Sequence, residues 1–301
     1  MKITKRDAIR IAIAYGEVFD YPLTEEEIIT WAPFCVIRTL PAVLQGESLK
    51  MRKRLIAIRN KRRAWSEKKW IRARRVAKFL KIIPTITLVG VTGGLTRSNA
   101  GDADDIDFLI ITTPKTLWVT RGFSTILLDL FGLRRRPSDI KLRNLICLNM
   151  FMSEDGLRVP PKERDLFTAH EVLLMTPLWE RDGIYKRFLY ANAWVKKFLP
   201  NAWEERRRNY ELRIMNYGKH MSYELHIFSF ILHTSYFILR LVEPFVKHLQ
   251  LFYMKSRRTT EVVTDYVIRF HPRDARVWIK RKLGERLTRF NVPLDKIFYG
   301  R

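Results

Sequence analysis

The chain has 301 residues and carries 56 Lys and Arg against 31 Asp and Glu, a formal net charge of +25 at pH 7. Its 47% hydrophobic and 12% aromatic content excludes an intrinsically disordered chain. The positive charge favours anionic partners such as nucleic acid, nucleotides or an acidic membrane face.

The first segment predicts a small helical unit. Apolar residues recur at helical spacing over 5–20, and Thr24 and Glu27 have the spacing of a capping box at the start of a second helix. The same segment has charges throughout and lacks the uninterrupted apolar core of a secretion signal, so we expect a cytoplasmic protein. Cys35 and Cys147 stand in apolar runs without CxxC spacing, which predicts buried thiols in a reducing compartment.

After a predicted loop at 39–48, residues 51–81 predict one long basic helix. They hold 14 Lys and Arg against a single acidic residue, Glu67, and their apolar residues fall three, four or seven apart. The exposed side of this helix is either a contact surface for phosphate backbones or a solvated exterior whose long side chains cover apolar surface.

A mixed core is predicted to follow Pro84. The stretches TITLVGV, DIDFLIIT and LICLNMFM are typical of strands, GGLTRSN of a turn or a brief helical segment, and residues 115–133 of a helix. From residue 164 the pattern is mainly helical, with a kink or break at Pro244, an extended stretch at 259–270 and a last helix at 275–287. The predicted fold class is α+β, a small mixed sheet flanked by helical regions.

One stretch, residues 225–242, raises the question of a membrane span. His226, His233 and Arg240 interrupt it, and its charge-free centre is shorter than the roughly 20 residues that a bilayer requires. We therefore expect no integral membrane insertion and favour a buried or half-buried helix. Attachment of residues 225–255 to a membrane surface is a weaker hypothesis.

Four aspartates lie within six positions: Asp102, Asp104, Asp105 and Asp107. Asp105 and Asp107 are one residue apart on a predicted strand, so their side chains should project from the same face. Two ionised carboxylates about 4 Å apart repel by about 4 kcal/mol at an effective dielectric of 20, so a cation is expected between them. Oxygen ligands of this kind suit Mg²⁺ or Mn²⁺.

A glycine pair precedes these aspartates at the end of the preceding strand. Gly93 and Gly94 allow backbone N–H groups to approach an anion, and Thr96, Arg97 and Ser98 add donors and a positive charge. Phosphate on one side and metal on the other predict a triphosphate held for phosphoryl or nucleotidyl transfer.

The segments VTGG at 91–94 and DID at 105–107 resemble the signature of the DNA-polymerase-beta-type nucleotidyltransferase superfamily. The resemblance implies that Gly93 and Gly94 bind the phosphates of an NTP and that Asp105 and Asp107 bind the divalent metal. Longer stretches, such as YGEVFDYPLTEEEI and DLFTAHEVLLMTPLW, resemble prokaryotic nucleotidyltransferase-domain proteins.

The resemblance also implies an organisation of the chain. A winged-helix-like unit is expected at 1–48, the long basic helix at 49–82, the nucleotidyltransferase core at 83–163 and a helical domain at 164–301.

One residue departs from the superfamily pattern. Its members usually have a third carboxylate on the next strand, whereas LICLNMFM offers Asn149, whose amide cannot act as a base. Either Glu154 or Asp155 reaches in from beyond the strand, or the acceptor supplies the base, or the site binds nucleotide without turnover.

Two functions therefore compete. The first is a metal-dependent nucleotidyltransferase that moves NMP from an NTP to an unknown acceptor hydroxyl, with RNA a plausible acceptor. The alternative is a non-catalytic nucleic-acid-binding protein with a degenerate nucleotidyltransferase fold. His170 and Glu171 begin an HExxH pattern, but Leu174 replaces the second histidine, which excludes a zinc protease of that class.

Overall fold

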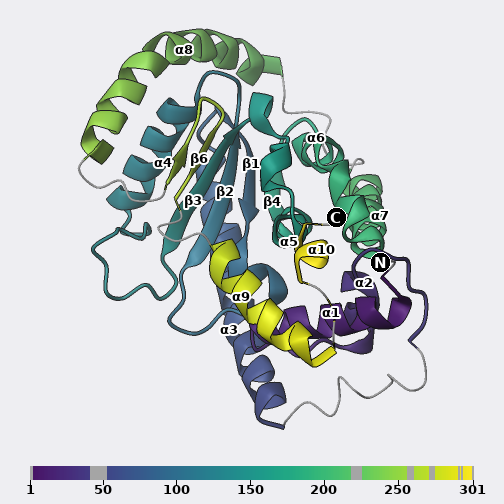
Figure 1. Cartoon of the computed structure of the whole chain (residues 1–301). Coiled ribbons are helices and arrows are strands. Elements are labelled where there is room, and N and C mark those ends of the chain that lie inside the picture. The colour runs from purple at the N-terminus through teal and green to yellow at the C-terminus, as the bar shows by residue number, and fades with distance from the viewer. Residues whose placement is uncertain are drawn as a thin grey trace.

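The computed structural model of the chain describes residues 3–40, 53–217, 226–255, 261–270, 275–290, 292 and 294–299. Most of the predicted loop at 39–48 and residue 225 fall outside these ranges. The described residues form a mixed sheet of six strands covered by helices (Figure 1), which confirms the α+β class.

The sheet order is β4-β1-β2-β3-β6-β5. The strands are β1 (Ile86–Val91), β2 (Ile106–Thr112), β3 (Ile146–Ser153), β4 (Thr176–Glu180), β5 (Val262–Val263) and β6 (Val267–Arg269). The α-helices are α1 (Lys5–Val18), α2 (Glu25–Trp31), α3 (Lys53–Leu80), α4 (Leu117–Leu130), α5 (Leu166–Leu174), α6 (Ile184–Ala191), α7 (Pro200–Tyr217), α8 (His226–Lys255), α9 (Ala275–Leu287) and α10 (Leu294–Phe298). The 3₁₀ helices are η2 (Gly93–Arg97), η3 (Glu154–Gly156), η4 (Pro161–Glu163), η5 (Ala193–Lys197) and η6 (Thr288–Phe290).

Helices α1 and α2 both begin at capping boxes. The Thr24 hydroxyl accepts a hydrogen bond from the Glu27 N–H while the Glu27 carboxylate accepts from the Thr24 N–H, which confirms the predicted cap. Thr4 and Asp7 repeat the arrangement at α1. The winged-helix-like character stays a prediction, because residues 41–52 lie outside the described part of the chain.

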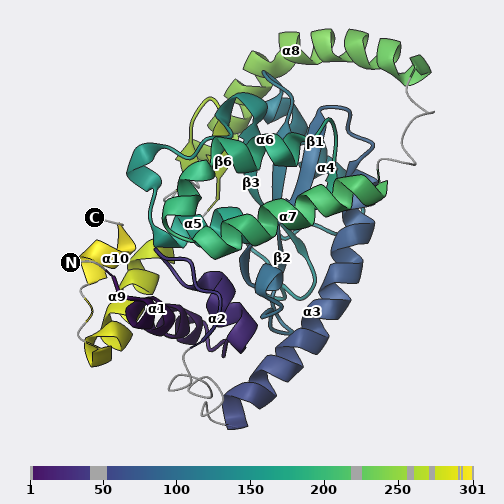
Figure 2. The same ribbon diagram turned by 90° about the vertical axis from the view of Figure 1, so that its right-hand side faces the viewer.

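Each strand points alternate side chains to opposite faces of the sheet. Both sets are buried, because a hydrophobic core covers each face. The core on one face includes side chains of α1, α5, α6, α7, α9 and α10, and the core on the other includes side chains of α3, α4 and α8. Figure 2 shows α6 and α7 in front of the strands. In β2, Leu109 and Ile111 belong to the first core, whereas Phe108 and Ile110 belong to the second. Asp107 shares the parity of Leu109 and so lies on the first face.

Strands β2 and β3 are parallel, and their register decides which side chains meet. Asp107 lies opposite Cys147, and Phe108 lies opposite Leu148. The next pair is Leu109 with Met150, so Asn149 is the extra residue of a β-bulge. Consequently Asn149 is not the partner of any residue of β2.

The segment 164–301 contributes more to the sheet than its helical pattern predicts. Within the stretch 259–270, the described residues 261–270 form the β5–β6 hairpin, as expected, and β6 pairs with β3. Strand β4 was not expected, because five residues beginning with Thr176 and Pro177 are too short for a clear period. It pairs with β1 and closes that edge of the described sheet.

Helix α8 arches over α4 (Figure 1). It also carries exposed apolar residues. Five of them recur three or four residues apart and are exposed, namely Ile238, Leu241, Phe245, Leu249 and Phe252, which we call the α8 stripe. Of the two expectations at Pro244, a kink or a break, the break is wrong, since the helix continues through the proline. Among the described residues, none of the helices combines the length and the apolar character that crossing a bilayer requires.

Helix α3 uses several of its cations inside the molecule. The Arg59 guanidinium pairs with Glu27 at 2.8 Å and lies over the Tyr21 ring, and Arg62 donates to Asn99 at 3.1 Å. Lys69 is 1% exposed. These cations therefore join α3 to the N-terminal helices and to the loops beside β1 and β2.

Candidate functional site

The four clustered aspartates have different roles. Asp102 pairs with Arg143 at 3.0 Å, and the Asp104 carboxylate accepts the Gly101 N–H at 2.7 Å, which closes a turn. Both therefore shape the acidic loop, residues 101–105. Asp105 and Asp107, at the start of β2, are left to form a site.

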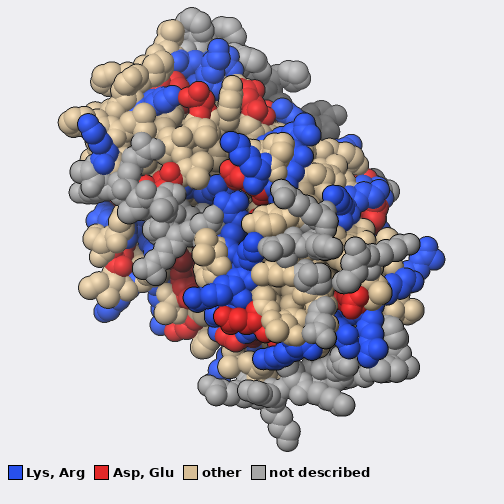
Figure 3. Space-filling view, in the orientation of Figure 1, with Lys and Arg blue, Asp and Glu red and all other residues tan. Residues whose placement is uncertain are grey.

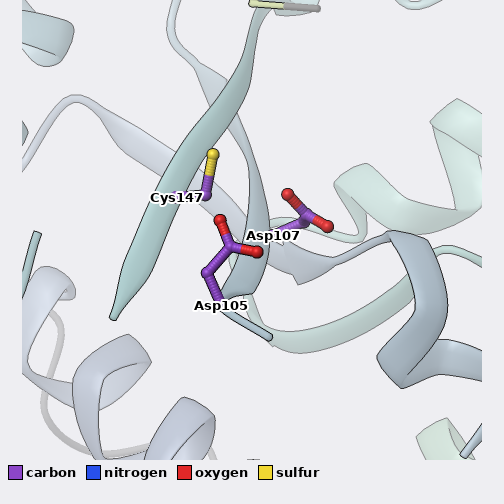
Figure 4. Close-up of side chains that lie close together, drawn as sticks. All are labelled: Asp105, Asp107 and Cys147. Atoms are coloured by element: carbon purple, nitrogen blue, oxygen red, sulfur yellow. The ribbon is translucent and has the colours of Figure 1, made fainter. Parts of the chain in front are cut away.

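Asp105, Asp107 and Cys147 lie together at one end of β2 and β3 (Figure 4). Their donor atoms lie within 4.8 Å of one another. The prediction that Asp105 and Asp107 share a face is thus confirmed. The third donor is a sulfur atom, which follows from the register of β2 and β3.

A cation of the chain already contacts this cluster. Nη1 of Arg135, from the loop between α4 and β3, lies 2.7 Å from Oδ2 of Asp105 and 3.9 Å from Sγ of Cys147. The Arg135 side chain is 37% exposed, so it can leave without opening the core. The guanidinium neutralises part of the charge that two carboxylates concentrate here.

The acidic loop rests on a buried lysine. Nζ of Lys69 donates to the backbone oxygens of Asp104 at 2.6 Å and Asp102 at 3.2 Å, and to Oδ1 of Asn144 at 3.0 Å. Burial lowers the Lys69 pKa, although the neighbouring Asp104 and Asp102 oppose the shift. Lys69 thereby fixes the backbone that delivers Asp105 to the site.

Gly93 packs directly against Asp107. Its φ of +71° lies in the left-handed region, and a Cβ added there would lie 2.5 Å from Oδ2 of Asp107. The Thr92 N–H donates to the Asp107 backbone oxygen at 3.0 Å, which holds the two segments together. Gly94, next in the chain, is exposed. A side chain at position 93 would therefore displace Asp107.

Burial dominates the titration of this cluster. It raises the pKa of Asp107 to about 7, helped by the negative charges of Asp105 and then of Glu171 on α5. Burial also raises the pKa of the Cys147 thiol, again with contributions from Asp107 and Asp105. The cluster thus favours the arrival of a cation, which would stabilise the ionised forms.

No third carboxylate comes from the predicted positions. The expectation that Asn149 occupies the third position is wrong, because Cys147 lies opposite Asp107. Glu154 and Asp155 follow the far end of β3, where Ser153 pairs with Thr112. At about 3.3 Å per residue that end is roughly 16 Å from Asp107, and Glu154 pairs with Arg187 at 2.7 Å. The hypothesis that either reaches the site is therefore wrong.

The predicted phosphate contacts Thr96, Arg97 and Ser98 follow Gly93 and Gly94 in η2 and its cap, on the side that meets α1 and α5. The Thr96 hydroxyl donates to the Gly93 oxygen at 2.7 Å, within its own turn. The Arg97 guanidinium pairs with Glu171 at 3.1 Å and lies over the Phe19 ring, 4.5 Å from its centroid.

Beside Arg97 lies a pocket of about 230 Å³ between the N-terminal helices and η2. Aromatic rings form much of its lining: Tyr15, Phe19, Tyr21, Trp31 and His170. The His170 ring is stacked on Tyr15 with centroids 3.9 Å apart and faces Trp31 at 5.3 Å. The pocket thus offers flat apolar surfaces next to the predicted phosphate-binding segment.

Sequence reasoning missed Cys147, Arg135, Lys69 and Glu171 as members or supports of the site. Cys147 has the expected position on the third strand, but only the register shows that it faces Asp107. Arg135 and Lys69 stand among many basic residues, and nothing local distinguishes them. Glu171 lies in a segment with a helical pattern, and that pattern does not indicate which distant residues it contacts.

Comparison with models of protein families, with curated proteins and with solved structures finds no match to this chain. The motifs and the geometry described above are therefore the basis for assigning a function.

Proposed function

We propose that the protein is a metal-dependent nucleotidyltransferase that moves NMP from an NTP to an acceptor hydroxyl. The observation that carries the proposal is the contact of Gly93 with Asp107, which joins the glycine pair and the two carboxylates in one site. A backbone open to phosphate and two acidic metal ligands are the parts that such a transfer needs.

The donor set fits a divalent cation. Asp105 and Asp107 would hold the ion, since hard oxygen ligands suit Mg²⁺ or Mn²⁺, whereas the Cys147 sulfur does not suit Mg²⁺. The chemistry that such an ion supplies when bound is neutralisation of phosphate charge.

The chain's own groups position the substrate. Gly93 and Gly94 would let the phosphates approach the backbone, and Arg97 would exchange part of its pairing with Glu171 for a phosphate oxygen. The aromatic pocket beside Arg97 supports a nucleotide substrate, because bases stack on such surfaces. As the bond to the α-phosphorus forms, the acceptor hydroxyl would lose its proton to water, because no third carboxylate lies at the strand positions, and pyrophosphate would leave. Positioning and charge neutralisation then carry the catalysis.

The test is binding of each of the four NTPs with and without Mg²⁺ or Mn²⁺, followed by transfer of label from the preferred NTP to cellular RNA. In Asp105→Asn and Asp107→Asn, metal-dependent binding should fall by at least about 100-fold, or about 2.7 kcal/mol. Asp155→Asn is the matched control, because Asp155 is exposed at the opposite end of β3. Equal NTP binding by wild type and both site variants would refute the proposal.

The alternative, a nucleic-acid-binding protein, is favoured by the exposed side of α3. Lys61, Lys68, Arg75 and Lys78 recur at helical spacing with the half-exposed Ile71 among them. They span about 25 Å at 1.5 Å per residue. Lys and Arg are also spread over the face shown in Figure 3, with carboxylates between them.

Salt dependence tests this alternative. If the α3 cations contact phosphates, replacing Lys61, Lys68 and Arg75 with Ala should reduce the slope of log affinity against log salt by about 2 to 3. Replacement of Arg187, Arg207 and Lys247, which pair with acidic residues elsewhere, is the matched control. An unchanged slope in the α3 variant would exclude this surface.

A further inference from the structure

We infer that the site binds a thiophilic divalent ion, of the class of Zn²⁺, through Asp105, Asp107 and Cys147. The inference builds on the proposed function, because it uses the same two carboxylates, but it changes the identity of the metal. Its basis is a disagreement between the donor set of the site and the all-oxygen set that Mg²⁺ requires.

Geometry supports a single three-donor site. The two carboxylates and the thiol come from adjacent parallel strands whose register places Asp107 beside Cys147. Their donor atoms lie within 4.8 Å of one another, so small side-chain shifts bring all three to an ion with metal–ligand bonds of about 2.0 to 2.3 Å.

The chemistry of the donors then selects the ion. Mg²⁺ takes oxygen ligands in a strict octahedron. Zn²⁺ and similar ions bind both thiolate and carboxylate ligands, and their fourth coordination position can stay open. Coordination replaces the S–H bond of Cys147 with a metal–sulfur bond and releases the proton to solvent. Three protein ligands and one open position are the arrangement of a site that also accepts a substrate oxygen.

A second observation points to a cation at this place. The Arg135 guanidinium contacts two of the three donors, the Asp105 carboxylate and the Cys147 sulfur, from an exposed loop. Arg135 thus places a positive charge on two of the three donors that would hold the ion. Metal binding is therefore an exchange, in which Arg135 turns outward and the ion takes over its contacts.

Cobalt is the probe, because Co²⁺ replaces Zn²⁺ and shows a thiolate-to-metal charge-transfer band in the near ultraviolet. The full chain, kept reduced and free of nucleotide, is titrated with Co²⁺. The band should appear in wild type and in Cys35→Ser, and it should be lost in Cys147→Ser. Cys35 is the matched control, because it is the other cysteine of the chain.

Competition and two further variants complete the test. Zn²⁺ should remove the cobalt band at concentrations at least about 100-fold lower than Mg²⁺ does. Cys147→Asp should lower this Zn²⁺ preference by at least about tenfold, because it restores an all-carboxylate set. Arg135→Gln should bind Co²⁺ more tightly than wild type, whereas Arg136→Gln, whose guanidinium pairs with Asp129, should not.

The outcomes separate this inference from the proposed function. A wild-type protein that binds no Co²⁺, or a band that survives in folded Cys147→Ser, overturns the inference. If circular dichroism shows that Cys147→Ser does not fold, the inference is tested by the cobalt band of wild type and by the Zn²⁺ preference of Cys147→Asp. A cobalt band with no NTP binding keeps the metal site and refutes only nucleotidyl transfer.

Discussion

Lys69 is the residue on which the acidic loop depends. It is buried and donates to three oxygens, two of them backbone oxygens of that loop. We expect Lys69→Met to lower the free energy of unfolding by about 3 kcal/mol, because it removes the three hydrogen bonds of this buried lysine at once and leaves the Asp104 oxygen only the Asn144 N–H. Urea denaturation measures the change. Lys68→Met, one residue away and exposed, should stay within about 0.5 kcal/mol of wild type, and an equal loss in both would contradict the role given to Lys69.

A second prediction at the residue scale concerns His170 and the pH dependence of the free energy of unfolding. Its buried ring donates Nδ1–H to the Leu166 oxygen at 2.8 Å, and burial lowers its pKa from 6.5 to about 3. Because the folded pKa is depressed, the stability that neutral His170 contributes is full above pH 6.5 and is lost as pH falls towards 3.

The advantage of wild type over His170→Gln in the free energy of unfolding should therefore shrink by about 2 kcal/mol between about pH 7 and pH 5. Urea denaturation at the two pH values checks this. The exposed His248 supplies the control, since His248→Gln should follow the wild-type pH dependence. A constant difference between wild type and His170→Gln would show that the pKa of His170 is the same in the folded and unfolded states, which contradicts the prediction.

At the scale of elements, α8 is joined to α4 by a carboxylate. Glu243 accepts the backbone N–H groups of Trp118 and Val119, each at 2.8 Å, in the first turn of α4. We expect Glu243→Ala to cost about 1 to 2 kcal/mol and to speed hydrogen exchange at the start of α4, because these N–H groups lose their cap. Glu67→Ala, with an exposed side chain on α3, is the control. Unchanged exchange in α4 would refute this cap.

Much of this element order could be predicted from the sequence. The periods of 85–91, 105–112 and 145–152 predicted β1, β2 and β3, because buried strands leave a local apolar run. The register between β2 and β3 could not be predicted, because the bulge at Asn149 depends on pairing with a distant strand. The spacing of Asp105 and Asp107 therefore predicted two members of the site. The third, Cys147, is found only from the fold.

For the molecule as a whole, α9 ties the end of the chain to its beginning. Arg286 of α9 donates to the Glu17 oxygen of α1 at 3.0 Å, and Leu283 is fully buried in the core that both helices share. Leu283→Ala should lower the free energy of unfolding by about 3 kcal/mol. The chain should still unfold in one common transition, with its midpoint at a lower urea concentration, because the N-terminal helices do not unfold independently. Fluorescence and far-ultraviolet dichroism during urea denaturation test whether the transitions coincide. Val277→Ala, 72% exposed on the same helix, should change little, and two separate transitions would contradict the coupling.

The α8 stripe has a consequence for how the protein behaves in solution. Copies of a chain with a charge of +25 repel each other, and that repulsion keeps their exposed apolar rows apart. Salt shortens the range of this repulsion from about 10 Å at 0.1 M to about 3 Å at 1 M, while apolar attraction persists. Concentrated salt will therefore promote self-association of the protein, whereas a buffer of low ionic strength will keep it dispersed.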